Sequence, residues 1–184
     1  MSIIDFGENP IIAATRSYED FKCAINSSVS TVFILSCNLI DIDKYTDEAH
    51  ANGKKLFIHI DFVDGISKDA AGVSYLATKK IDGIISTRSS VIKCASDKGI
   101  PCVQRFFMVD SRSVDTAIDA MRSSRPDMIE IMPAIAYKTI TKIKNSTSVP
   151  IIAGGLVEKK DEIFAAISAG ASGVSTADKN LWDI

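Results

Sequence analysis

The 184-residue chain contains no apolar run that approaches the ~20 residues of a membrane-spanning helix, so we expect no membrane span. Its first residues have neither a basic stretch nor the long apolar core of a secretory signal. The four cysteines form no Cys-x-x-Cys pair, and no histidine stands near them at a spacing typical of metal ligands. We therefore expect free thiols in a reducing cytoplasm, with no metal site and no cofactor.

The chain also lacks a strong excess of charge of either sign. Its net charge is −2 and its isoelectric point is about 5.7, which predicts no strong attraction for nucleic acid or for an anionic membrane. Basic residues form only modest clusters on expected helices, and such clusters are usually solvated faces. They are Lys79 with Lys80, Arg122 with Arg125, and Lys138 with Lys142 and Lys144.

Short apolar runs alternate with amphipathic segments along the whole chain, which favours an α/β fold with parallel strands. Eight such units divide the 184 residues into units of 23, enough for one strand, one helix and two short loops. The expected strands are 10–15, 31–37, 55–61, 82–87, 102–108, 128–132, 151–154 and a short run at 173–174 that ends in Ser175-Thr176. We predict one domain over residues 1–184, a small (β/α)₈ TIM-type barrel with short loops.

An open, doubly wound sheet is the competing architecture. It is less favoured because no Gly-x-Gly-x-x-Gly motif opens a helix, and because the signals for phosphate binding lie late in the chain. After the eighth strand too few residues remain for a full helix, and Trp182 is expected to seal the hydrophobic surface.

The signal for phosphate binding comes from the last two units. The strand 151–154 ends at Gly154-Gly155, where the absence of Cβ atoms allows an anion to approach backbone N–H groups. The last strand ends in Ser175-Thr176, whose hydroxyls and following helix start would complete the anion site. In TIM barrels the loops after strands seven and eight frequently bind phosphate. The alternative is two ordinary turns in which glycine only relieves strain.

Alternation along the strand 55–61 places Phe57, His59 and Asp61 on one side, and the last two at the ligand mouth if that side faces inward. Asp61 could accept hydrogen bonds from the hydroxyls of a small polyol, or it could cap the next loop. His59 could contact the ligand, or it could be a core histidine with satisfied hydrogen bonds.

Glu130 lies between Ile129 and Ile131 in an expected strand, where an unpaired carboxylate would be costly. Arg105 and Arg88 are the candidate cationic partners, and either could reach the ligand instead. A structural ion pair between Glu130 and Arg105 and a ligand clamp both remain open.

Several stretches line up in order along the chain. They are Val32–Leu35, Phe57–Asp61, Asp82–Arg88, Gln104–Phe107, Ile129–Pro133, Pro150–Gly155 and Gly173–Thr176 with Leu181-Trp182. Together they closely resemble the glycerol uptake operon antiterminator family, from about Pro10 to Trp182. One departure is the stretch Ser36–Ile40, where a glycine-containing turn is expected.

The resemblance implies a small barrel that binds glycerol-3-phosphate and then promotes transcription through a terminator in leader mRNA. It implies regulation rather than catalysis, with glycerol-3-phosphate and leader mRNA as partners; a homo-oligomer stays open. The ligand would contact its phosphate through Gly154, Gly155, Ser175 and Thr176, and its polyol through His59, Asp61, Arg88, Arg105 and Glu130.

An enzyme is the alternative. His59, Asp61 and Glu130 could supply a base and an acid, as an isomerase, aldolase or phosphodiesterase acting on a small sugar phosphate would need. No lysine stands near the carboxyl end of an expected strand, which weakens a Schiff-base mechanism. The fold cannot decide, since TIM barrels support many functions.

Overall fold

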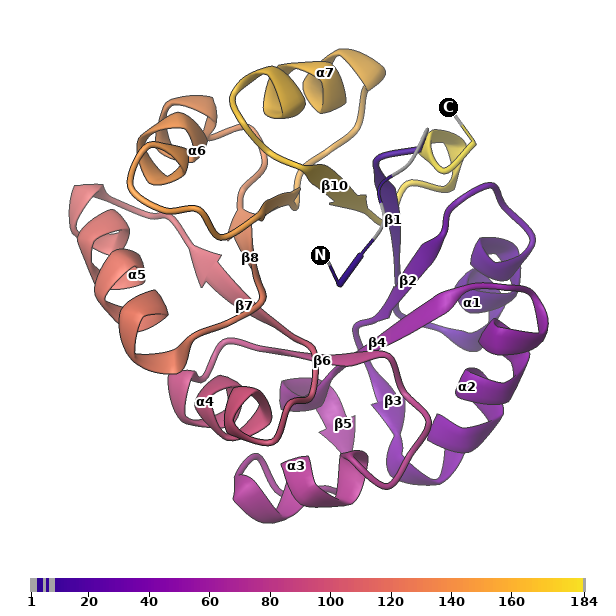
Figure 1. Cartoon of the computed structure of the whole chain (residues 1–184). Helices are drawn as coiled ribbons and strands as arrows, with labels where there is room; N and C mark the ends of the chain where they lie inside the picture. Colours follow the sequence, from indigo (N-terminus) through magenta and orange to yellow (C-terminus); the bar gives the residue numbers. More distant parts are fainter. Residues whose placement is uncertain (1–2, 5, 7–8, 184) are drawn as a thin grey trace.

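A computed structural model, which describes residues 3–4, 6 and 9–183, shows a closed barrel of eight parallel strands (Figure 1). The strand order is β1-β10-β9-β8-β7-β6-β4-β2, and β1 pairs with both β2 and β10 to close the ring. The predicted (β/α)₈ barrel is therefore confirmed. The strands are β1 (Ile11–Thr15), β2 (Thr31–Ile34), β4 (Lys55–His59), β6 (Gly83–Ser86), β7 (Cys102–Phe107), β8 (Met128–Met132), β9 (Ile151–Gly154) and β10 (Gly173–Thr176).

Helices surround this ring on the outside (Figure 1). They are α1 (Tyr18–Ile25), α2 (Ile42–Ala51), α3 (Ala70–Leu76), α4 (Ser89–Asp97), α5 (Ser111–Ser124), α6 (Tyr137–Lys144) and α7 (Lys160–Ser168). None of the helices in the described part of the chain is long and apolar enough to cross a membrane. A short 3₁₀ helix, η3 (Lys179–Leu181), follows β10. Trp182 next to it is buried and donates to the carbonyl of Thr176 at 3.0 Å, as expected of a residue that seals the core.

Helix starts follow local chemistry. Ser17 caps α1 by accepting from the backbone N–H of Asp20 at 3.1 Å, and Asp110 caps α5 by accepting from that of Ser113 at 2.8 Å. Each bond satisfies an N–H group that has no partner inside the helix. These caps fix where the preceding loops end.

Two strands end earlier than their apolar runs suggest. β2 stops at Ile34, and the chain then forms β3 (Cys37–Asn38), which pairs with β5 (Val63–Asp64) in a separate small sheet. This sheet takes the place of the expected glycine-containing turn. β4 stops at His59 because the chain continues into a 3₁₀ helix, η2 (Ile60–Phe62). Asp61 therefore lies beyond the strand, and the alternation of β4 does not set the direction of its side chain.

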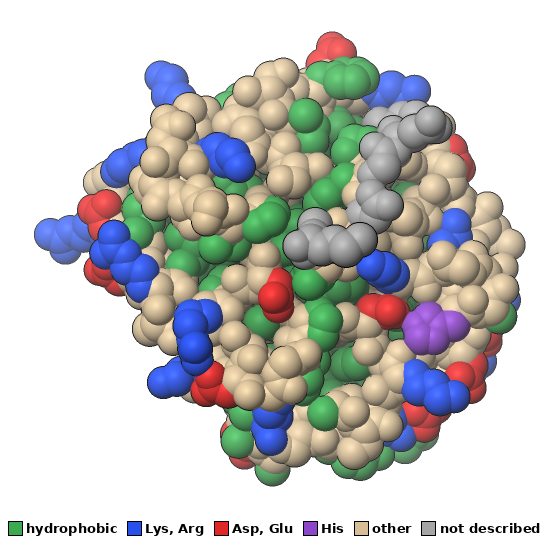
Figure 2. All heavy atoms as spheres, in the orientation of Figure 1, with side chains coloured by type: hydrophobic (Ala, Val, Ile, Leu, Met, Phe, Trp, Pro, Cys, Tyr) green, Lys and Arg blue, Asp and Glu red, His purple; other side chains and the backbone are tan. Residues whose placement is uncertain are grey.

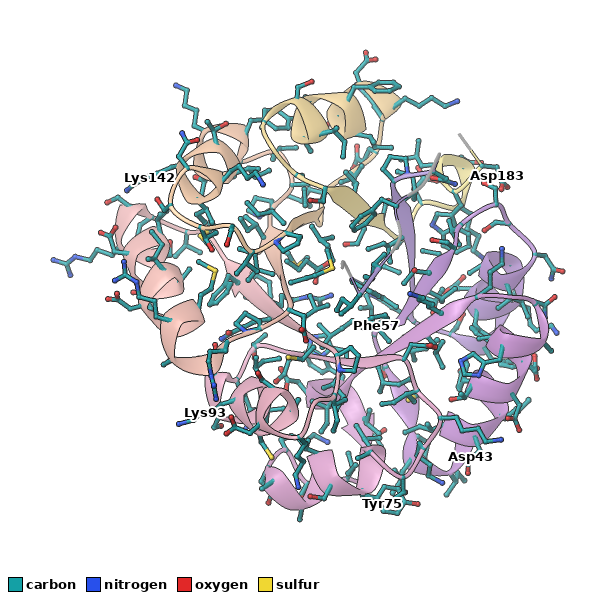
Figure 3. All side chains as sticks on the ribbon, in the orientation of Figure 1. Asp43, Phe57, Tyr75, Lys93, Lys142 and Asp183 are labelled. Atoms are coloured by element: carbon teal, nitrogen blue, oxygen red, sulfur yellow. The ribbon has the colours of Figure 1, made fainter. Side chains whose placement is uncertain are left out.

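The interior of the barrel is apolar at the end where the strands begin. Phe57 packs there with Phe33 and Ile4, and Figure 3 labels Phe57 inside the ring of strands. Gly83 leaves room for the Phe57 ring, since a Cβ at Gly83 would lie 2.2 Å from that ring. Lys55 donates to the carbonyl of Ile3 at 2.8 Å, which holds Ile3 against this end. The carboxyl ends of the strands are thus left as the open end.

Candidate functional site

The open end of the barrel contains a cavity of about 220 Å³. It is lined by Ala14, Arg16, Leu35, Arg105, Glu130, Met132, Gly155, Leu156, Val157, Glu158, Ser175, Thr176, Ala177 and Asp178. An adjoining cavity of about 290 Å³ shares Arg16, Leu35 and Arg105 with it. Pockets for drug-sized ligands are typically ~300–1,000 Å³, so the first cavity suits a small molecule.

The loop after β9 has an unusual backbone. Gly155 and Leu156 both have positive φ, 78° and 59°, and only the first is a glycine. Such strain in a non-glycine residue is often found at functional sites. The N–H groups of Leu156 and of Ala177, in the neighbouring loop after β10, have no acceptor among the residues that the structure describes. Two backbone donors at the cavity are therefore free to bind an anion.

The hydroxyls of Ser175 and Thr176 are used within the protein. Ser175 donates to Glu130 Oε1 at 2.5 Å, and Thr176 donates to the carbonyl of Val157 at 3.2 Å. Gly154 provides space for the first of these bonds, because a Cβ there would lie 2.5 Å from Glu130 Oε1 and 2.6 Å from Ser175 Oγ. An anion in this cavity would depend on backbone donors more than on these hydroxyls.

Glu130 and Arg105 form a buried ion pair across neighbouring strands. Arg105 Nε lies 2.5 Å from Glu130 Oε2, and the two side chains are 7% and 0% exposed. The register of β7 and β8 pairs the two residues directly. Within the described structure the terminal guanidinium nitrogens of Arg105 have no hydrogen-bond partner, and Arg105 lines both cavities. The same arginine can therefore hold Glu130 and present donors to a ligand.

His59 is fully buried, yet neither ring nitrogen has a hydrogen-bond partner among the residues described. Its Nδ1 lies 3.9 Å from Asp61 Oδ2, and its ring contacts that of Phe62 with centroids 5.0 Å apart. Burial, with a further contribution from the charge of Arg105, lowers the pKa of His59 to about 4. At neutral pH the imidazole is uncharged, with one donor and one acceptor.

Asp61 and Arg88 lie outside the lining of both cavities. Asp61 accepts hydrogen bonds from the Ser86 hydroxyl at 2.6 Å and from the N–H and hydroxyl of Thr87 at 2.8 and 2.7 Å. Burial raises the pKa of Asp61, but these hydrogen bonds outweigh it and hold the pKa below its ordinary value. Arg88 is exposed, with Nε 3.9 Å from Asp61 Oδ1. Ligand contact by these two residues stays a prediction.

Sequence reasoning missed Arg16. It follows β1 directly and lines both cavities, and its guanidinium forms no ion pair within residues 3–4, 6 and 9–183. The available signal was its position, one residue beyond the expected first strand and so at the carboxyl end of the barrel.

The thiols of Cys37 and Cys102 are not suited to nucleophilic catalysis. Burial, followed by the charges of Asp41 and Asp64, raises the pKa of the Cys37 thiol to about 11, and burial raises that of Cys102 to about 12. Both are protonated at neutral pH and are poor nucleophiles. Across the described residues, no group of three or more His, Cys, Asp or Glu side chains could hold a metal ion.

The chain matches the family model of the glycerol-3-phosphate responsive antiterminators over residues 11–182. It is 33% identical over 178 residues to Escherichia coli K12 YgcP, an uncharacterized protein, covering 96% of this chain and 93% of that one. Its structure resembles the Listeria monocytogenes glycerol uptake operon antiterminator regulatory protein, with a TM-score of 0.92, 30% identity and 97% of each chain covered.

The glycerol uptake operon antiterminator-related protein of Thermotoga maritima gives a TM-score of 0.84 at 29% identity, covering 94% of this chain and 96% of that one. More distant barrels include an aldolase, QR15, at 13% identity and a TM-score of 0.74, which shares the fold alone. The predicted family is thus confirmed over nearly the whole chain. The chain belongs to the glycerol-3-phosphate responsive antiterminators.

Proposed function

We propose that glycerol-3-phosphate binds in the cavity at the carboxyl ends of the strands. The observation that carries this proposal is that Arg16, whose guanidinium forms no ion pair in the described chain, lines the same cavity as the loops after β9 and β10. The phosphate accepts from the backbone N–H groups of Leu156 and Ala177 and from the Arg16 guanidinium. Hydrogen bonds between charged groups and fixed donors are the strong ones.

The glycerol part faces the other side of the cavity. The terminal guanidinium nitrogens of Arg105 are donors at this cavity, and Glu130 holds the guanidinium in place. His59 lines neither cavity and is fully buried, and burial followed by the charge of Arg105 lowers its pKa; its two ring nitrogens have no partner in the described structure. An uncharged imidazole can both donate to a hydroxyl and accept from one, as recognition of a polyol requires.

The output is regulation of transcription in the cytoplasm. Family membership supports leader mRNA of glycerol uptake genes as the second partner, and a ligand that is bound but not converted. Binding of glycerol-3-phosphate then raises the affinity for RNA, and by linkage RNA tightens the binding of glycerol-3-phosphate by the same factor. The enzyme alternative rests on His59 and Asp61, which lie 3.9 Å apart.

Replacing Ala177 by aspartate is expected to weaken glycerol-3-phosphate binding by about 100-fold or more. The exposed Ala177 lines the cavity, and a carboxylate there faces the phosphate; juxtaposed like charges cost several kcal/mol. Isothermal titration calorimetry measures the effect. The matched control is Ala51→Asp, which adds the same charge at an exposed alanine in the last turn of α2 and should bind as wild type does.

A second variant addresses the cation. Arg16→Gln keeps much of the side-chain length but removes the charge, and we expect binding about tenfold weaker, since hydrogen bonds to charged groups are worth about 1.5–3 kcal/mol. Wild-type affinity in both Ala177→Asp and Arg16→Gln would place the ligand elsewhere and end this proposal.

A further inference from the structure

Three loops at the open end repeat one surface pattern. Each presents an exposed aliphatic side chain, followed three residues later by an exposed cation. The pairs are Val109 with Arg112, Ile135 with Lys138, and Leu156 with Lys159. The aliphatic side chains are 85%, 45% and 67% exposed, and Phe107 in the first loop is 57% exposed. We call residues 107–112, 133–138 and 155–160 the loop rim; these ranges include the end of β7 and the first residues of α5, α6 and α7.

The loop rim is one continuous surface. Its loops follow β7, β8 and β9, which are neighbours in the barrel. The N–H of Met108 donates to the carbonyl of Met132 at 2.7 Å, and the N–H of Ala134 donates to that of Gly155 at 3.1 Å. Backbone hydrogen bonds thus join each loop to the next, and the three pairs lie around one arc of the mouth.

The loop rim is basic, although the chain is acidic. It contains four cations, Arg112, Lys138, Lys159 and Lys160, against two carboxylates, Asp110 and Glu158, a formal charge of +2, whereas the whole chain carries −2. None of the four cations forms an ion pair with any residue in the described ranges. The carboxylate of Asp110 is already used to cap α5.

Three cations of the helical clusters differ in this respect. Lys142 lies 3.8 Å from Asp115, Arg122 lies 3.4 Å from Asp119, and Arg125 contacts Asp97. Figure 2 shows Lys and Arg side chains over α5 and α6 with acidic side chains beside them, and Figure 3 shows Lys142 on the outer side of α6. Their acidic partners offset much of the attraction that these cations would have for a polyanion.

We infer that the loop rim is the surface that binds a single-stranded segment of leader RNA. This inference rests on the proposed function, and it assigns the RNA partner to a place. Phosphates contact Arg112, Lys138 and Lys159, and a base stacks on Phe107. Cations beside exposed apolar and aromatic side chains are what single-stranded RNA recognition uses. Leu156 belongs both to the loop rim and to the lining of the ligand cavity. RNA and glycerol-3-phosphate therefore both contact the loop after β9.

The test is a fluorescence anisotropy titration of the leader transcript of a glycerol uptake operon, with saturating glycerol-3-phosphate, at several salt concentrations. Arg112→Ala/Lys138→Ala should weaken binding and make the salt slope shallower by about 1.4, at ~0.7 for each phosphate contact on a single strand. Phe107→Ala should weaken binding by about tenfold, as expected for one stacked base.

The matched control, Arg122→Ala/Lys142→Ala, removes the same number of charges from later turns of α5 and α6. It should keep the RNA affinity and the salt slope of wild type. Calorimetry with glycerol-3-phosphate separates the two proposals, because the loop-rim variants should bind this ligand as wild type does. Circular dichroism verifies that each variant is folded. The charge variants and Phe107→Ala change only exposed side chains, so we expect them to fold. If one of them misfolds, the other still tests the inference.

Three results would overturn the inference. The first is wild-type RNA affinity in both loop-rim variants. The second is a loss of RNA binding in the helix control instead. The third is a change of oligomeric state in Phe107→Ala, seen by analytical ultracentrifugation, with RNA affinity unchanged, which would make the loop rim a contact between copies of the chain. If wild type binds glycerol-3-phosphate but no leader RNA, the RNA role fails and the ligand site stands.

Discussion

Replacing Glu130 by alanine is expected to lower the free energy of unfolding by about 3–5 kcal/mol, the usual effect of removing one partner of a buried ion pair. Glu130 is fully buried, and its two oxygens accept from Arg105 and Ser175. The variant leaves the guanidinium of Arg105 beside an empty space and the Ser175 hydroxyl without its acceptor. Urea unfolding measures the loss as a lower midpoint.

Two further variants show whether the loss comes from the unpaired charge. Arg105→Met/Glu130→Leu removes both charges and should recover a large part of the stability, since buried ion pairs are often replaceable by apolar side chains. Lys22→Ala breaks an exposed pair with Glu48 at 3.2 Å and should cost only about 0–1 kcal/mol. A cost for Glu130→Ala no larger than that of Lys22→Ala would contradict the buried network.

The second large effect concerns pH. The folded-state pKa of His59 is about 4, below the value of about 6.5 expected in the unfolded chain. Between these values the unfolded chain binds a proton that the folded protein does not, so stability falls as pH falls. The contribution of the uncharged His59 to stability is fully present above about pH 6.5 and is lost by about pH 4. The pKa shift corresponds to about 3 kcal/mol in the free energy of unfolding.

The variant His59→Gln cannot take up this proton. Urea unfolding at a series of pH values should therefore show a weaker fall in stability for His59→Gln than for wild type between about pH 6.5 and 4. His50→Gln is the control, because His50 is partly exposed on α2 and faces Asp82 at 2.8 Å. This variant should show the same fall in stability from His59 as wild type does. Parallel curves for wild type and His59→Gln would show that His59 titrates normally in the folded protein.

The architecture could be predicted because its causes are local. Each strand of the barrel corresponds to an apolar run, and the caps at Ser17 and Asp110 need only nearby residues. The errors came where the chain stops being regular. Alternation beyond His59 suggested one direction for Asp61, but the turn of η2 carries its carboxylate to Ser86 and Thr87 instead.

The position of the cavity was predictable, and the hydrogen-bond partners of the residues that line it were not. The two late loops do meet at one cavity, which follows from strand order. That Ser175 would donate to Glu130, with Gly154 leaving the space between them, depends on the register and twist of three neighbouring strands. The position of Arg16 at the cavity depends on the closure of the barrel, which brings the end of β1 beside the end of β10.

Phosphorus NMR of glycerol-3-phosphate with the purified protein tests the central claim most directly, because one spectrum reports both binding and conversion. The account predicts a shifted or broadened phosphate resonance with wild type, little change with Ala177→Asp, and no new resonance during prolonged incubation. An unperturbed resonance with wild type would contradict the ligand site. A growing product resonance that Asp61→Asn abolishes would make the protein an enzyme.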